Sequence, residues 1–246
     1  MNNKEQISIK NKDNHIVITI NEEEFSPELI HHNLQTIISE INTNKNIWVV
    51  GFDLTNVKKI SNLNSRELID NYSLTNLIIN IKKPVVGLIN GDVSNRLLEL
   101  TLPMDYRIAG VNSSFRMSQM YDYNMQFDGA TRLLPRIIGL NQAKQMIMFG
   151  KTYDSKTALK MGLINELVED NHLNLTLDEK LLNLSKNSPL AMQFTKNAIN
   201  FNLSTNTMQG INSENDLYSI LLNSHDRKNS IDSFKKRKKR KPYSGK

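Results

Sequence analysis

The chain has 246 residues, enough for one large domain with a sizeable hydrophobic core. With 39% hydrophobic residues and only 10 Gly and 6 Pro, its composition is typical of a globular protein. The formal net charge is +6, but residues 235–246 carry eight basic and no acidic side chains, which leaves 23 basic against 25 acidic side chains elsewhere. Because the rest of the chain is slightly acidic, a basic nucleic-acid-binding face on the fold is not expected.

Several other classes of protein are excluded by residues that the chain lacks. It has no cysteine, which excludes disulfides, thiolate metal sites and cysteine nucleophiles. Its five histidines show no metal-binding spacing such as H-E-x-x-H, so no metal site is expected, and the absence of a Rossmann glycine pattern gives no reason to expect a redox cofactor. The first 15 residues are too polar for a signal peptide, and no apolar stretch approaches the roughly 20 residues that span a bilayer. We therefore expect a cytoplasmic protein.

Strand and helix patterns alternate along the first part of the chain. The β-branched run at 15–20 predicts a strand, and apolar residues at helical spacing after a Ser-Pro start predict a helix at 26–41. Apolar runs at 47–54 and 83–90 are long enough for buried strands, and a helical pattern at 65–81 lies between them. This alternation indicates a layered α/β core.

The pattern changes towards the C-terminus. Residues 89–103 predict the end of a buried strand, a tight turn at Asn90 and Gly91, and an apolar helix. Beyond this helix, strands are expected at 105–109 and 162–168 and helices at 141–150 and 154–162. From about residue 172 the pattern is helical throughout. We therefore divide the chain into an α/β core, residues 1–171, and a helical C-terminal region with a basic tail, residues 172–246.

Three consecutive segments carry a resemblance to a known family. They are "KKPVVGLINGDV", "ELTLPMDYRIAGVNSSFRMSQ" and "GATRLLPRIIGLNQAKQMIMFGKTYDSKTALKMGLINELVE", and the similarity continues to "KKRKKRKPYSGK" at the end. In order and nearly without gaps after residue 83, they resemble the crotonase superfamily, the enoyl-CoA hydratase/isomerase family. The resemblance implies a spiral of ββα turns with a C-terminal helical trimerisation region, assembled as a trimer or as a hexamer of two trimers.

The resemblance also implies a binding site for an acyl thioester. In that family two backbone N–H groups hold the thioester carbonyl and stabilise the enolate, and one of them lies at a helix start after N-G-x-A-x-G-G-G-x-E-L. A helix N-terminus suits this task because it offers unpaired N–H groups and a positive dipole potential. Here Asn95, Arg96 and Leu97 stand at the three glycine positions, so Arg96 is the expected donor. The second donor aligns with Asn64 in "ISNLNSREL".

Candidate acid/base residues follow from the same alignment. Glu99 matches the first of the two glutamates that act on water in the family's hydratases, but Gln119 stands at the second. An amide orients water yet exchanges no proton at neutral pH, so two-glutamate hydration is not expected. Asp122 and Asp128 lie where relatives place alternative acid/base groups, and Asp128, before Gly129, is the better candidate. An acidic residue in a first helical turn, such as Glu99, also has a purely structural explanation.

Arg96 separates the functional hypotheses. Its guanidinium could pair with a substrate carboxylate or a CoA phosphate, or replace a backbone donor; alternatively it turns to solvent or fills an inactive site. Ser94 or Asn95 could also cap the helix with a side-chain oxygen and occupy the N–H groups that an oxyanion needs.

The resemblance predicts what the basic tail and the site would bind. The resemblance places the tail near the acyl-CoA, where Lys238 and Lys241 would bind CoA phosphates by simple electrostatics. The leading hypothesis is therefore hydration, isomerisation or decarboxylation of an acyl-CoA or carrier-bound acyl thioester, in fatty acid or polyketide metabolism, with CoA as part of the substrate. The rival is a catalytically silent homologue that serves as a scaffold subunit in a biosynthetic pathway. Nucleic-acid binding and membrane binding are not expected.

Overall fold

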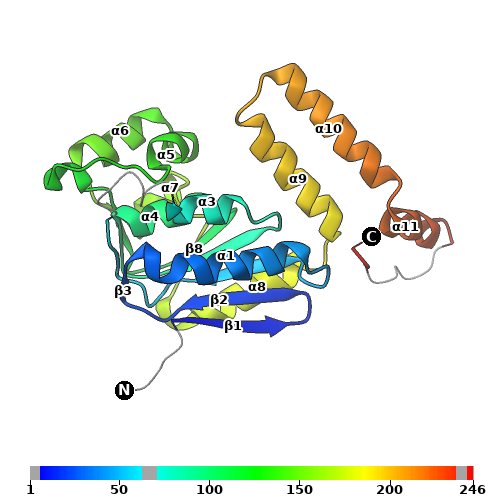
Figure 1. The fold of residues 1–246 in the computed structure, drawn as a ribbon, viewed down its shortest axis with the longest axis horizontal. Coiled ribbons are helices and arrows are strands. Elements are labelled where there is room, and N and C mark those ends of the chain that lie inside the picture. The colour runs from blue at the N-terminus through cyan, green and yellow to red at the C-terminus, as the bar shows by residue number, and fades with distance from the viewer. Residues whose placement is uncertain (1–5, 63–70, 237–242, 246) are drawn as a thin grey trace.

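A six-stranded sheet forms the centre of the protein (Figure 1). The computed structural model describes residues 6–62, 71–236 and 243–245. The strands lie in the order β1-β2-β4-β6-β8-β11, with β1 antiparallel to β2 and all other pairs parallel. Their bounds are β1 Ile7–Lys12, β2 His15–Ile20, β4 Val49–Asp53, β6 Val85–Ile89, β8 Tyr106–Gly110 and β11 Glu166–Val168.

Short strands form two further sheets. One has the order β10-β9-β7 and the other pairs β3 with β5. Along the chain each of β2, β4, β6 and β8 in the large sheet is followed by a strand of a small sheet, namely β3 Glu24–Phe25, β5 Lys59–Ile60, β7 Asp92–Ser94 and β9 Ser114–Arg116; β10 spans Tyr153–Asp154. This repetition of two strands and a helix confirms the predicted spiral α/β fold.

Helices cover both faces of the large sheet. Ile16, Ile18 and Ile20 of β2 pack in the same apolar cluster as α1, whereas Val17 packs against Leu177 and Leu181 of α8. Because both faces are buried, the parallel strands are nearly continuous apolar runs. The helices are α1 Pro27–Thr43, α3 Leu74–Ile79, α4 Asn95–Thr101, α5 Ala130–Ile138, α6 Leu140–Phe149, α7 Ser155–Lys160 and α8 Leu173–Leu184, with 3-10 turns η1 Gln119–Asp122 and η2 Asp170–His172.

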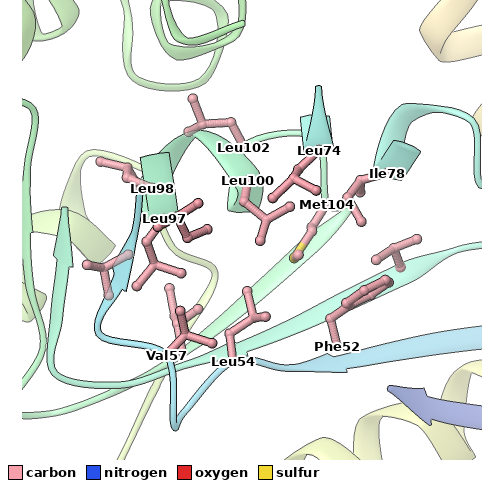
Figure 2. Packing of buried hydrophobic residues seen from close by; sticks show 14 of the residues in the cluster. Phe52, Leu54, Val57, Leu74, Ile78, Leu97, Leu98, Leu100, Leu102 and Met104 are labelled. Atoms are coloured by element: carbon pink, nitrogen blue, oxygen red, sulfur yellow. The ribbon is translucent and has the colours of Figure 1, made fainter. Parts of the chain in front are cut away.

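Helix α4 is embedded in the core. All its residues from Arg96 to Thr101 are buried. Figure 2 shows Leu97 and Leu100 of this helix packed towards Leu54 and Val57, with Leu74 and Ile78 of α3 beside them. A helix that is buried around its whole circumference contacts neighbouring elements on all sides. The first residues of α4, and the side chains that they carry, are therefore held rigidly.

The last three helices form an arm. Figure 1 shows α9 (Pro189–Asn202) and α10 (Thr207–Leu222) as a pair that stands away from the sheet, with α11 (His225–Lys235) near the C-terminus. Lys196 of α9 ties the arm to the core through Asp105, at 2.7 Å. Asp226 accepts hydrogen bonds from the amides of Ser244 and Gly245, both at 2.8 Å, so the last described residues return to the start of α11.

The elements differ from the sequence-based prediction in a few places. The described part of the predicted helix 65–81 is α3, at 74–79, and residues 63–70 lie outside the described residues. Strand β1 was not predicted, because Ser-Ile-Lys-Asn-Lys is polar and the strand lies at the sheet edge. Helix α5 was not predicted either, since Pro135 lies inside it. No helix in the described ranges is long and apolar enough to cross a membrane.

Candidate active site

The turn between β6 and α4 has the backbone shape that the sequence led us to expect. Gly91 has a φ of +77° and Asn95 a φ of +51°, both in the left-handed region. Asparagine tolerates this conformation better than most residues with a side chain, so the turn forms although the first family glycine is replaced. Helix α4 then begins at Asn95, and Arg96 is its second residue. The Arg96 N–H therefore has no acceptor one turn earlier in the helix.

Neither candidate cap blocks this helix start. Ser94 makes no side-chain capping bond. The side-chain oxygen of Asn95 accepts hydrogen bonds from the backbone N–H of Ser118, at 2.7 Å, and from its hydroxyl, at 3.3 Å. The possibility that one of these side chains caps α4 is therefore not realised. Asn95 instead fixes the start of α4 to the segment that leads into η1.

The Arg96 side chain is buried, with 2% of the residue exposed, so its turning to solvent is excluded. One terminal nitrogen donates to the carbonyl of Ser61 at 2.7 Å, and the other lies 3.3 Å from an Asp128 carboxylate oxygen. The guanidinium carbon stands 4.9 Å from the centre of the Phe127 ring, a cation–π distance. Its Nε is buried with no partner among the described residues. Arg96 thus links α4, the end of β5 and the loop before α5.

Asp128 is the second member of this group. Besides Arg96, its carboxylate accepts a hydrogen bond from the Ser73 hydroxyl at 2.5 Å and a longer one from the Thr75 N–H at 3.5 Å. The same Ser73 hydroxyl caps α3 by accepting from the Asn76 N–H. Asp128 is consequently a buried carboxylate whose charge is balanced by Arg96.

Glu99 completes the group, one turn of α4 beyond Arg96. It is fully buried, and one of its carboxyl oxygens accepts a hydrogen bond from the Asp128 N–H at 3.3 Å. The other oxygen, Oε2, has no partner in the described part of the chain. Burial, reinforced by the nearby Asp128 carboxylate, raises the pKa of Glu99 to about 7, against the opposing effects of the backbone N–H groups of Asp128 and Ala130 and of Arg96. Near neutral pH Glu99 can therefore both take and give a proton.

The other candidate residues form no hydrogen bond or ion pair with this group within the described ranges, or lie outside those ranges. Gln119 is buried, and its side-chain oxygen accepts from the Gln126 amide at 3.0 Å, while its own amide nitrogen lacks a partner. Asp122 is exposed. Asn64, Lys238 and Lys241 lie outside the described residues. The structure thus brings Arg96, Glu99 and Asp128 together and leaves Asp122 on the surface.

Comparison with known proteins is decisive for the family. A sequence model described as enoyl-CoA hydratase/isomerase matches residues 32–245 of this chain. The chain belongs to the enoyl-CoA hydratase/isomerase family. The short-chain-enoyl-CoA hydratase of Clostridium acetobutylicum is 26% identical over 194 residues, which cover 78% of this chain and 74% of that protein. The one from Clostridioides difficile is 30% identical over 156 residues, covering 63% of this chain and all of that protein.

Solved structures agree with the fold. The crystal structure of an enoyl-CoA hydratase from Bacillus anthracis superimposes with a TM-score of 0.89, covering 98% of this chain and all of that one, at 24% sequence identity. At this identity the similarity concerns the fold alone. Enoyl-CoA hydratase/isomerase family membership makes an acyl-CoA thioester the expected class of substrate, without a metal. Among the described residues no group of three or more His, Asp or Glu side chains could hold a metal ion.

Sequence reasoning missed Ser61 and Ser73, which contact the buried charges. Ser73 lies inside the predicted helical range 65–81, so its place as the N-cap of α3 was not foreseen. Nothing in the sequence indicated that its hydroxyl would also donate to Asp128, 55 residues away. Ser61 contributes only its carbonyl, which any residue would supply.

Proposed function

We propose that this protein transfers protons on an acyl-CoA, or on a carrier-bound acyl thioester, with Glu99 as its single acid/base, as in the isomerisation of a 3-enoyl to a 2-enoyl thioester. The observation that carries the proposal is the Glu99 carboxyl. It is fully buried, one oxygen has no partner, and its pKa is raised to about 7. A general acid/base is most effective when its pKa lies near the working pH.

Isomerisation needs one group that takes a proton and returns it. The Glu99 carboxylate would remove a proton from Cα, and the electron pair would move into the thioester carbonyl to form a dienolate. The Arg96 N–H and, by alignment, the Asn64 N–H would donate to the enolate oxygen. Glu99 would then return the proton to Cγ, which regenerates the carbonyl and shifts the double bond. Hydration by two carboxyl groups is not favoured, since Gln119 cannot exchange a proton and its side-chain oxygen already accepts a hydrogen bond from the Gln126 amide.

A direct test follows the conversion of a short 3-enoyl-CoA to the 2-enoyl-CoA. We expect turnover by the wild type, a loss of about 10²-fold or more in Glu99→Gln, and a small effect in the matched control Gln119→Ala. Circular dichroism and the oligomeric state must be unchanged in both variants. Turnover that survives in Glu99→Gln, or that disappears only in the Gln119 variant, would remove Glu99 from the mechanism.

A catalytically silent homologue is the second candidate, and the Arg96 side chain favours it. The guanidinium is bonded to Ser61 and Asp128 in space that glycine would leave free at the usual donor position. Calorimetric titration with a non-hydrolysable acyl-CoA separates the two. If the protein is an active enzyme, the wild type binds the acyl-CoA analogue. If the site is blocked, only the Arg96→Gly variant binds it.

We also propose that the chain assembles as a trimer or hexamer through its C-terminal arm, and that Lys238 and Lys241 bind the CoA phosphates. The arm exposes large apolar side chains that a monomer would leave in water, including Ile199, Phe201, Met208, Ile211 and Tyr218. Light scattering tests the assembly.

The proposed role of Lys238 and Lys241 is tested separately. A double Lys238→Ala and Lys241→Ala variant is expected to weaken acyl-CoA binding and its salt dependence.

A further inference from the structure

Lys83 is a buried lysine that has no counter-ion among the described residues. Only 7% of the residue is exposed, and its ammonium donates to the carbonyl of Asn44. Across residues 6–62, 71–236 and 243–245, no carboxylate forms an ion pair with it. Burial lowers the pKa of Lys83 to about 8, with no neighbouring charge to oppose this effect. A buried cation is normally paired, because its desolvation is costly.

A second buried lysine shows what pairing looks like in the same region. Lys196 is equally buried, at 8% exposed, but it lies 2.7 Å from Asp105 and also donates to the carbonyl of Lys83 at 2.9 Å. Asp105 therefore forms its ion pair with Lys196 and not with Lys83. Of these two buried lysines, Lys83 is the one that lacks a carboxylate partner in the part of the chain that the structure describes.

Lys83 lines a cavity of about 190 Å³ between the end of α1, the start of β6 and the start of α9. Lys45 and Gln193 also line it, together with the apolar residues Ile47, Trp48 and Leu190. None of the described residues that line it is acidic. It also lies at the opposite end of β6 from the turn that leads to Arg96 and Glu99, since Lys83 precedes the strand and Asn90 follows it.

We propose that this cavity binds a small organic carboxylate, whose charge pairs with Lys83 and whose short apolar tail packs against Trp48 and Leu190. The positive lining selects an anion, and the apolar walls favour an organic acid over inorganic phosphate or chloride. The first residues of α9 add the positive end of a 14-residue helix. The bound anion would also bridge the core to the C-terminal arm, because α1, α9 and Gly245 all contribute to the cavity.

Trp48 provides the readout, since it is the only tryptophan in the chain. The full-length protein is titrated with butyrate, and with chloride and phosphate at equal ionic strength, while Trp48 emission is followed. We expect a saturable change with butyrate alone, weakened by roughly tenfold or more in Lys83→Met and retained in Lys82→Met, whose side chain is exposed one residue away. Glu99→Gln should leave the curve unchanged, which separates this cavity from the active site.

Other outcomes overturn the proposal. These are an unchanged curve in Lys83→Met, identical curves with chloride or phosphate, or no saturable change in the wild type. Lys83→Met should remain folded, because none of the carboxylates that the structure describes loses its partner. A second measurement needs no variant: saturation transfer from the protein to the butyrate methyl protons must saturate over the same concentrations, and its absence also overturns the assignment.

Discussion

Two clusters of buried charge differ in how completely they are satisfied. The clamp cluster consists of Asp105, Arg107 and Lys196, and the site cluster consists of Arg96, Glu99 and Asp128. In the clamp, Arg107 donates to the carbonyls of Leu163 and Met104, both at 2.6 Å, and Asp105 accepts from Lys196 and from the Val85 N–H, both at 2.7 Å. None of its side-chain atoms is buried without a partner in the described ranges.

The site cluster is incomplete by comparison. Arg96 Nε and Glu99 Oε2 are both buried and unpartnered among the described residues. Native proteins satisfy nearly all buried polar atoms, and the exceptions collect where a ligand or a reaction uses them. We propose that the clamp holds the fold together, whereas the site cluster retains polar atoms for another partner. Substitutions in the two clusters should therefore have opposite effects on activity and on stability.

The largest expected effect is on activity. Glu99→Gln should lower kcat/KM for thioester proton transfer by about 10²–10⁴-fold, because the amide cannot exchange a proton. Asp105→Asn, in the clamp, should leave kcat/KM nearly unchanged. Steady-state kinetics on both variants and the wild type compares their kcat/KM values. Equal losses in the two would show that the clusters do not differ in role.

Glu99→Gln should increase the stability of the fold, by an amount that depends on pH. Its pKa is about 7 in the fold against an ordinary 4.5, so the folded state holds the proton more tightly, and the free energy of unfolding falls as pH rises through this window. Glu99→Gln has no carboxyl to ionise, so its free energy of unfolding does not show this fall. The difference in free energy of unfolding between Glu99→Gln and the wild type should therefore grow by about 2 kcal/mol between pH 5 and pH 8, as measured by denaturant unfolding. A pH-independent difference between the two proteins contradicts the raised pKa.

A smaller loss of stability is expected in the clamp. Asp105→Ala leaves Lys196 buried without a counter-ion, at a cost of about 2 kcal/mol, below the 3–5 kcal/mol typical of fully buried pairs because the Asp105 side chain is 35% exposed. Adding Lys196→Met should restore most of this, since it removes the unpaired charge. Thermal or urea unfolding of the single and double variants measures the coupling, and purely additive losses would argue against it.

The smallest effect serves as a surface reference. Lys58 and Glu23 form an ion pair at 2.7 Å, but their side chains are 67% and 66% exposed. Lys58→Met should change the free energy of unfolding by less than about 0.5 kcal/mol, and added salt should remove the difference. A loss as large as that in Asp105→Ala would mean that burial does not distinguish these pairs.

Much of the fold was predictable from sequence, because burial on both faces of a parallel sheet leaves apolar runs that are easy to recognise. Strands β4, β6 and β8 and helices α1 and α6 fall within one or two residues of the predicted ranges. The strands of the small sheets are only two or three residues long and carry no periodicity, so pattern reasoning did not detect them. Strand β1 was missed because an edge strand tolerates a polar sequence.

The site was predictable by residue but not by arrangement. Alignment with the family singled out Arg96, Glu99 and Asp128, yet spacing alone did not show that the Arg96 guanidinium would turn inward to Asp128, 32 residues away. Nor did it show that the Asn95 side chain would bond Ser118 and leave the helix start uncapped. Such choices depend on which partner lies within reach after folding, and that is a property of tertiary structure.

The most direct test of the central claim is exchange of the Cα protons of butyryl-CoA in deuterated water, followed by proton NMR. It requires only enolate formation, and therefore no knowledge of the natural acyl group. We predict exchange with the wild type, at a rate that rises with pH to a plateau above about pH 7 as Glu99 ionises, and no exchange above background with Glu99→Gln. Equal exchange in the two proteins, or none in the wild type although it binds the thioester, would contradict the assignment of Glu99 as the acid/base.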